Sequence, residues 1–148
     1  MIARIDHLNI VVTDLAHAID FFRLLGFAEG LGSELDPAFL ERLTGIAGAR
    51  GRFVTLRHPG SNVTIELLHF AADSGTDPLL GRADRIGLRH LAFAVEDIEA
   101  TVGSLRAAGV EFLSPIQTWE KTGKRLVYLH GPDGILLELA EYPPAVNQ

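Results

Sequence analysis

The chain has 148 residues, a length that fits one ordinary domain or two small modules with a shared core. Its composition is that of a globular protein, and a net charge of −6 without any run of Lys or Arg argues against a nucleic-acid partner. The absence of cysteine excludes disulfides, a thiolate nucleophile and a cysteine-type zinc site. No signal-peptide pattern follows Met1 and no apolar stretch approaches the roughly 20 residues of a membrane helix, so we expect a cytoplasmic protein without a membrane partner.

The first half of the chain predicts a strand, a helix and further strands. Apolar and β-branched residues at 5–12 indicate a buried strand. Asp14 is then a good N-cap for a helix, and Gly26 is placed to end it. Two later strands are expected at 52–57 and 63–70, which leaves a third strand of this half without a clear signal.

The second half repeats these signals in the same order. Residues 88–95 predict a strand, Asp97 an N-cap and Gly109 a helix end. The strands expected after this helix are 110–113, 125–129 and 135–142.

Two segments stand outside the repeated pattern. The first half has surplus residues at 31–51, with a short helix expected at 36–43. A tolerated surface insertion, a lid and a dimer contact are the interpretations that stay open for this surplus. Residues 71–86 contain several Asp and Gly, which is typical of a linker between modules.

The two halves also share individual residues at a constant displacement of 83 positions. Identical pairs at this displacement are His7/His90, Leu8/Leu91, Val12/Val95, Asp14/Asp97, Arg23/Arg106 and Gly26/Gly109. Further along, Glu66 within Val63–Leu68 has a counterpart in Glu138 within Ile135–Ala140. An internal repeat is the economical explanation, and each copy carries one His and one Glu.

Strand periodicity gives these His and Glu residues a common chemistry. Alternate residues of a strand point to opposite faces, so His7 and His90 lie on the face away from the bulky apolar residues that would pack on the helix. Glu66 and Glu138 each interrupt an apolar run, where a carboxylate needs a cation or a strong donor. One metal ion shared by both copies would satisfy both, and a set of two imidazoles and two carboxylates suits Zn²⁺, Ni²⁺, Co²⁺, Mn²⁺ or Fe²⁺.

Four motifs carry a resemblance to a known superfamily. They are residues 6–8 with the cap at 13–15, residues 65–67, residues 89–98 and residues 131–139. With them the chain resembles the vicinal oxygen chelate superfamily, which includes glyoxalase I, methylmalonyl-CoA epimerase, extradiol dioxygenases and bleomycin-resistance proteins, over nearly its whole length. The resemblance implies an α+β fold in which two tandem βαβββ modules, at about 1–72 and 86–144 of a single domain 1–148, form a curled mixed sheet around a metal-binding cleft. It also implies a homodimer.

The same resemblance implies an activity. By position, His7, Glu66, His90 and Glu138 match the four metal-ligand places of the superfamily. Ring-cleaving Fe(II) dioxygenases use two His and one Glu, whereas a fourth ligand such as Glu66 is typical of glyoxalase I and epimerases. We therefore expect a metal-dependent lyase or isomerase of glyoxalase I type that acts on a small-molecule substrate through a metal-stabilised enediolate, with Glu138 and Glu66 as catalytic residues. The alternatives are an epimerase of methylmalonyl-CoA type, an Fe(II) dioxygenase and a metal-free binding or resistance protein.

Some residues outside the four predicted ligands also invite a functional interpretation. His69 lies three positions after Glu66, so it should point to the opposite face and be a poor fifth ligand. The basic residues that precede a late strand are either contacts for a substrate carboxylate or phosphate, or part of a solvated loop; they are Lys121, Lys124 and Arg125.

Overall fold

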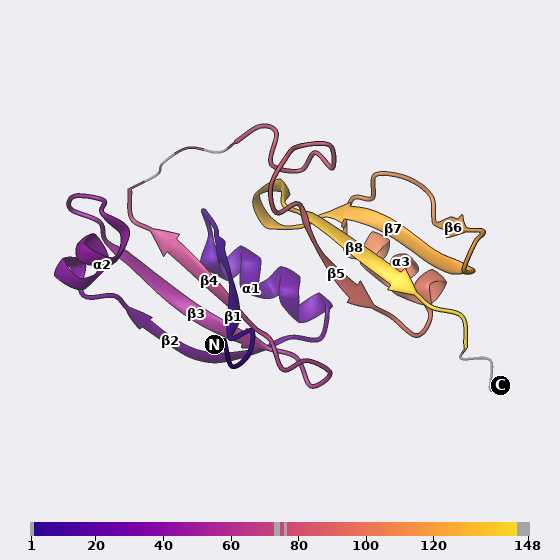
Figure 1. Ribbon diagram of the computed structural model, residues 1–148, viewed down its shortest axis with the longest axis horizontal. Helices are drawn as coiled ribbons and strands as arrows, with labels where there is room; N and C mark the ends of the chain where they lie inside the picture. Colours follow the sequence, from indigo (N-terminus) through magenta and orange to yellow (C-terminus); the bar gives the residue numbers. More distant parts are fainter. Residues whose placement is uncertain (1, 73–74, 76, 145–148) are drawn as a thin grey trace. The chain divides into compact units, whose positions relative to one another are not determined.

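The computed structural model describes residues 2–72, 75 and 77–144, and these form two compact units, Met1–Gly75 and Thr76–Gln148. Figure 1 shows that each unit contains a four-stranded mixed sheet and a long helix. The fold is therefore α+β and consists of two tandem modules, as the sequence predicts. No described helix is both long enough and apolar enough for a membrane span.

The first unit has the strand order β1-β4-β3-β2. Strand β1 pairs in parallel with β4, and the other pairs are antiparallel. The elements in chain order are β1 (His7–Val11), α1 (Leu15–Leu24), β2 (Ala28–Glu34), α2 (Pro37–Thr44), β3 (Gly51–Arg57) and β4 (Thr64–Phe70). The short helix expected in the surplus segment is present as α2, with Asp36 as its N-cap.

The second unit repeats this topology with the strand order β5-β8-β7-β6. Strand β5 is parallel to β8, and the remaining pairs are antiparallel. Its elements are β5 (His90–Ala94), α3 (Ile98–Ala107), β6 (Gln117–Trp119), β7 (Lys124–His130), a 3-10 turn at Pro132–Gly134 and β8 (Leu136–Glu141).

Both long helices begin and end where the repeated residues predict. The Asp14 and Asp97 side chains accept hydrogen bonds from the backbone N–H groups of His17 and Ala100 at 3.0 and 2.9 Å. Gly26 and Gly109 follow the helices with φ of +85° and +87°, a conformation that a glycine adopts without steric cost. The expected N-cap and the expected glycine at the helix end are therefore both confirmed in each half.

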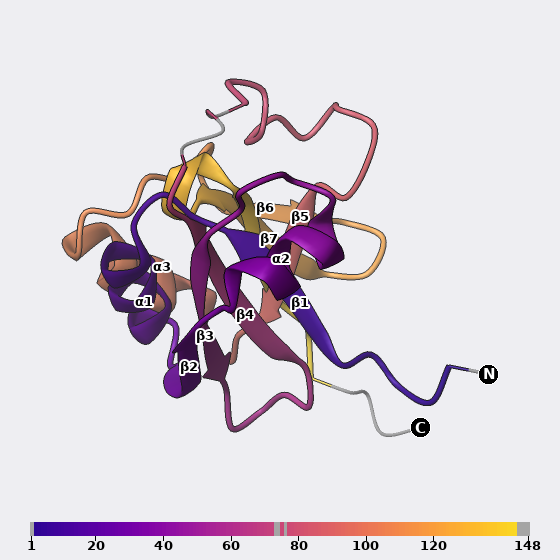
Figure 2. The same cartoon turned by 90° about the vertical axis from the view of Figure 1, so that its left-hand side faces the viewer.

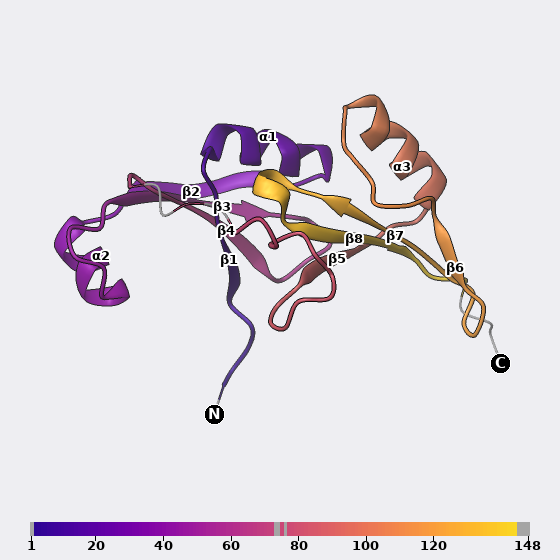
Figure 3. The same ribbon diagram turned by 90° about the horizontal axis from the view of Figure 1, so that it is seen from above.

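Each long helix covers one face of its own sheet (Figure 3). In the first unit the buried residues Leu15, Ala18 and Phe22 of α1 lie over the sheet, where Leu56 and Leu67 are also buried. In the second unit Ile98, Val102 and Leu105 form the buried stripe of α3, as expected. Helix α2 lies on the side of the first sheet opposite to α1 (Figure 2), and its buried Leu40 lies close to Gly51 of β3.

The outer strands are the part of the fold that the sequence misplaces. The strand expected at 110–113 is wrong, since Phe112 makes only an isolated bridge to Leu129. The strands that pair with β3 and β7 are instead β2 and β6, and every residue of both is exposed. An exposed edge strand has no buried face, so it lacks the alternating apolar pattern by which strands are predicted.

Candidate metal centre

In the first unit, the pairing of β1 with β4 brings the predicted His and Glu together. Asn9 is the register partner of Glu66, and His7 lies two residues before Asn9 on the same face. The Nε2 atom of His7 is 3.9 Å from Oε1 of Glu66. The Asn9 amide donates a hydrogen bond of 2.9 Å to the same oxygen. Glu66 is partly buried, with 26% of its side chain exposed, so its carboxylate is open to a further partner.

The imidazole of His7 is oriented by the residue before it. Its Nδ1 atom lies 3.0 Å from Oδ2 of Asp6, and Asp6 is also bonded to Arg4 at 2.7 Å. The hydrogen bond with His7, followed by that with Arg4, lowers the pKa of Asp6 below its ordinary value. A carboxylate beside Nδ1, with Nε2 directed elsewhere, is the arrangement found around histidines that bind a metal through Nε2.

The second unit brings together the corresponding pair. Glu138 is the register partner of Ala92 on β5, and Nε2 of His90 is 3.3 Å from Oε2 of Glu138. The ring of His90 also packs on Tyr128, with 5.2 Å between ring centroids. Glu138 differs from Glu66 in burial, since only 4% of the residue is exposed.

Lys124 is the cation that the buried carboxylate requires. Its Nζ atom donates a hydrogen bond of 2.7 Å to Oε1 of Glu138. This bond is the main reason that the pKa of Lys124 is raised above its ordinary value, so the side chain stays an ammonium. The ammonium also lies 5.4 Å from the centroid of the Tyr142 ring. Lys124 is therefore a partner of Glu138 and not part of a solvated loop.

The residues of both pairs fit a divalent ion. Two ligand atoms that are each about 2.1 Å from one ion lie roughly 3.0–3.4 Å apart. The His90–Glu138 pair already has this spacing at 3.3 Å, and the His7–Glu66 pair at 3.9 Å needs a small side-chain rotation. No group of three or more metal-binding side chains occurs within the described residues, so each unit by itself supplies two of the four predicted ligands. That all four bind one ion stays a prediction.

Two features of these sites need the structure. The sequence indicates that each Glu requires a donor, and the structure supplies Asn9 for one and Lys124 for the other. The only sequence signal for Asn9 is its place two residues after His7. His69, by contrast, behaves as expected, because it pairs with Arg52 on the helix-covered face, away from Glu66.

Comparisons with known proteins identify the family of the chain. The sequence profile of the glyoxalase/bleomycin resistance protein/dioxygenase superfamily matches residues 4–139. The Escherichia coli protein YaeR is 32% identical over 139 residues, which cover 93% of this chain and 95% of YaeR. The ethylmalonyl-CoA/methylmalonyl-CoA epimerase of Cereibacter sphaeroides is 32% identical over 147 residues, or 95% of this chain and 99% of the epimerase.

Solved structures show the same fold. A glyoxalase family protein from Bacillus cereus has a TM-score of 0.86 at 28% identity, and the match covers 96% of this chain and 95% of that protein. Glyoxalase I of Leishmania major has a TM-score of 0.66 at 20% identity, with 93% of this chain and 86% of that chain covered. The chain belongs to the glyoxalase/bleomycin resistance protein/dioxygenase superfamily.

Proposed function

We propose that the protein is a metal-dependent isomerase or lyase that moves a proton on a carbon atom next to a carbonyl group. The observation that carries this proposal is the repeated pair of an imidazole Nε2 and a carboxylate oxygen, at 3.9 Å in the first unit and 3.3 Å in the second. We assign His7, Glu66, His90 and Glu138 as the ligands of one divalent ion. Such an ion would stabilise the negative charge that develops on the carbonyl oxygen when the proton leaves.

The surroundings of the two carboxylates suggest different roles. Glu138 is buried, and each of its oxygens has its own partner, Lys124 on one and His90 on the other. Glu66 is more exposed, and its Oε1 atom accepts a hydrogen bond from the neutral amide of Asn9. Because a carboxylate must approach and leave the substrate carbon as it carries a proton, we assign the proton transfer to Glu66 and a fixed ligand role to Glu138.

Of the glyoxalase I and epimerase activities, epimerisation of an acyl thioester has the better support. The full-length match to an ethylmalonyl-CoA/methylmalonyl-CoA epimerase supports this choice. The proposal includes the expected homodimer, which sedimentation velocity would test.

The test measures proton exchange directly. Protein purified without added metal is mixed with methylmalonyl-CoA in D₂O, with and without Co²⁺ or Zn²⁺, and deuterium at the carbon between the two carbonyls is followed by NMR. We expect exchange only with metal. Glu66→Gln should slow exchange by about 10²–10⁴-fold, the usual contribution of a general base. Glu120→Gln, which changes an exposed glutamate outside both pairs, is the matched control.

Metal affinity separates the two glutamates. Calorimetric titration with Co²⁺ should show one ion per chain, with a larger loss of affinity in Glu138→Gln than in Glu66→Gln. Full exchange activity in Glu66→Gln would remove that residue from the mechanism. Wild-type protein that takes up no divalent ion would instead favour a small-molecule binding protein. Oxygen uptake with a catechol, retained in Glu66→Ala, would favour a ring-cleaving dioxygenase.

A further inference from the structure

Lys124 divides the carboxylate of Glu138 between its two oxygens. The lysine ammonium donates a hydrogen bond of 2.7 Å to Oε1, while Oε2 faces Nε2 of His90 at 3.3 Å. Both members of the ion pair are well covered, with 20% of the Lys124 side chain and 5% of the Glu138 side chain exposed. A hydrogen bond between two charged groups is strong in such surroundings, so the carboxylate is held against rotation.

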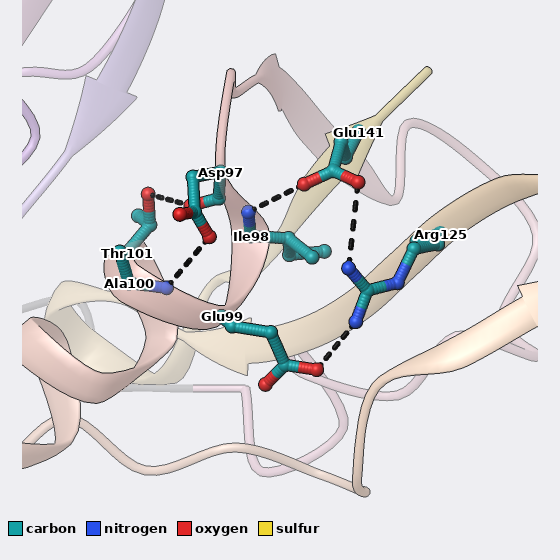
Figure 4. A network of polar contacts seen from close by, with 7 residues as sticks. All are labelled: Asp97, Ile98, Glu99, Ala100, Thr101, Arg125 and Glu141. Atoms are coloured by element: carbon teal, nitrogen blue, oxygen red, sulfur yellow. Dashed lines mark hydrogen bonds and ion pairs between the residues drawn. The ribbon is translucent and has the colours of Figure 1, made fainter. Parts of the chain in front are cut away.

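The backbone of Lys124 is anchored from the other face of the sheet (Figure 4). Arg125 follows Lys124 on β7 and therefore points to the helix-covered face. Its Nη1 atom donates to Glu141 at 3.4 Å, and its Nη2 atom bonds Glu99 of α3. Glu141 also accepts a hydrogen bond of 2.7 Å from the backbone N–H of Ile98, the first residue of α3. The start of β7 is thereby joined to both β8 and α3.

The path of the lysine side chain along the sheet is equally well defined. The pairing of β7 with β8 places Lys124 beside Tyr142, and the ammonium lies 5.4 Å from the centroid of that ring. Ala140 lies between Tyr142 and Glu138 on the same face of β8 and is buried. Because Ala140 has only a methyl group, it leaves room for the lysine chain to run along the face to Glu138.

The first unit shows that the shared topology does not require a lysine at this position. Arg52 and Arg125 are equivalent, since each is the register partner of the residue three positions after the glutamate of its unit. The residues before them are Gly51 and Lys124. A β-carbon on Gly51 would lie 2.7 Å from a backbone carbonyl oxygen of β4 and 3.4 Å from Cδ2 of the buried Leu40. No lysine fits there, so the lysine is particular to the second unit.

We propose that Lys124 is a positioning residue that makes Glu138 a one-oxygen ligand. This inference rests on the proposed function, in which His90 and Glu138 bind the divalent ion. By holding Oε1, Lys124 leaves only Oε2 for the ion. A carboxylate that used both oxygens would take one more position around the ion. A catalytic site has to keep a position open for its substrate, and Lys124 keeps that position available for an oxygen of the acyl thioester.

The first test follows the lysine ammonium directly. The ¹⁵Nζ resonance of Lys124 is recorded by NMR at low temperature in metal-free protein and after addition of Zn²⁺, and it is assigned by its loss in Lys124→Met. We expect the resonance in both samples, because the ammonium and the ion use different oxygens. If it is missing before or after loading, the ammonium is not held on Oε1 beside the ion, and the proposal is wrong.

The visible absorption of bound Co²⁺ reports how many oxygens Glu138 supplies, because the band weakens as the coordination number rises. Lys124→Met should weaken this band and raise the Co²⁺ affinity by about 10-fold, since both oxygens become available and no ammonium competes for them. Lys121→Met, which changes an exposed lysine of the turn before β7, should have neither effect. An unchanged band in Lys124→Met would overturn the proposal.

Lys124→Arg separates the position of the charge from the charge itself. Arginine keeps the positive charge, but its planar guanidinium can bond both oxygens of Glu138 at once. We therefore expect the Co²⁺ affinity to fall by about 10-fold or more. Wild-type affinity in Lys124→Arg would show that any cation suffices and would count against a positioning role.

These measurements also distinguish this inference from the proposed function. Wild-type protein that takes up neither Co²⁺ nor Zn²⁺ would overturn the metal centre and the role of Lys124 together. Wild-type protein that binds Co²⁺, with the same band and affinity in Lys124→Met and Lys124→Arg, would overturn the role of Lys124 alone.

Discussion

The two units carry the same His–Glu pair but hold its carboxylate in different ways. In the second unit Glu138 is buried and bonded to an ammonium, whereas in the first unit Glu66 is partly exposed and bonded to a neutral amide. The start of the helix differs in the same sense, because the first N–H of α3 is bonded to Glu141 while α1 lies beside a cavity. The two units thus share one strand topology, while the polar partners of equivalent side chains differ. We infer that the second unit holds its carboxylate more rigidly and that the carboxylate of the first unit is the more adaptable.

The largest expected effect compares the two helix cores. Phe22 of α1 is fully buried, and its ring packs edge to face on Phe21 and Phe27 at 5.6 Å between centroids. Phe22→Ala should lower the free energy of unfolding by about 4 kcal/mol, because a large cavity is left. Leu105→Ala, at the equivalent position of α3, should cost about 3 kcal/mol. Urea denaturation measures both, and equal losses below 1 kcal/mol would mean that these helices do not anchor their units.

The second prediction concerns the partners of the two glutamates. Lys124→Met leaves the buried Glu138 carboxylate without its cation and should cost about 3 kcal/mol in metal-free protein. Asn9→Ala removes a neutral donor from the more exposed Glu66 and should cost about 1 kcal/mol or less. Denaturation in EDTA measures the difference.

The pH dependence of the free energy of unfolding gives a control for the role of Lys124. The raised pKa of Lys124 means that its contribution is complete below the unfolded value of 10.5 and is lost as the pH rises through the higher folded value. Lys124→Met should lack this alkaline loss. Equal costs for Lys124→Met and Asn9→Ala would contradict the distinction between the two carboxylates.

The third prediction compares the two strand arginines. Arg125→Gln removes the bonds that join β7 to Glu141 and Glu99, which are partly open to solvent, and should cost about 1 kcal/mol. Arg52→Gln should have almost no effect on the ligand-free protein, because its guanidinium has no acidic partner among the described residues. Thermal unfolding of the two variants checks this, and a larger loss from Arg52→Gln would reverse the comparison.

The smallest effect concerns the exposed helix cap of the first unit. The hydrogen bond from the His17 backbone N–H is the main cause that holds the pKa of Asp14 below its ordinary value of 3.8. The stability that this cap contributes is therefore complete above pH 3.8 and is lost as the pH falls through the lower folded value. NMR titration of the Asp14 carboxyl carbon measures the shift. Asp14→Asn should remove this acid dependence, and an unshifted titration would show that the cap bond is absent in solution.

The sequence predicted the strand and helix elements that have strong local signals. Val12 and Leu15 are buried, and Asp14 caps a helix that ends before Gly26, because alternation, capping and glycine stops act within a few residues of one another. The edge strands β2 and β6 were missed. Their pairing with β3 and β7 is a tertiary interaction, and their exposed residues carry no local pattern.

The sequence by itself determined the repeat, the face on which each His lies and the equivalence of Glu66 with Glu138, because residue identity and strand parity are properties of the chain alone. Only the tertiary structure decided what surrounds each carboxylate. Lys124 reaches Glu138 because β7 and β8 pair in one register, and Arg125 pairs with Glu141 where the equivalent Arg52 pairs with His69. Such contacts join residues far apart in the chain, so no periodicity within a single strand or helix can specify them.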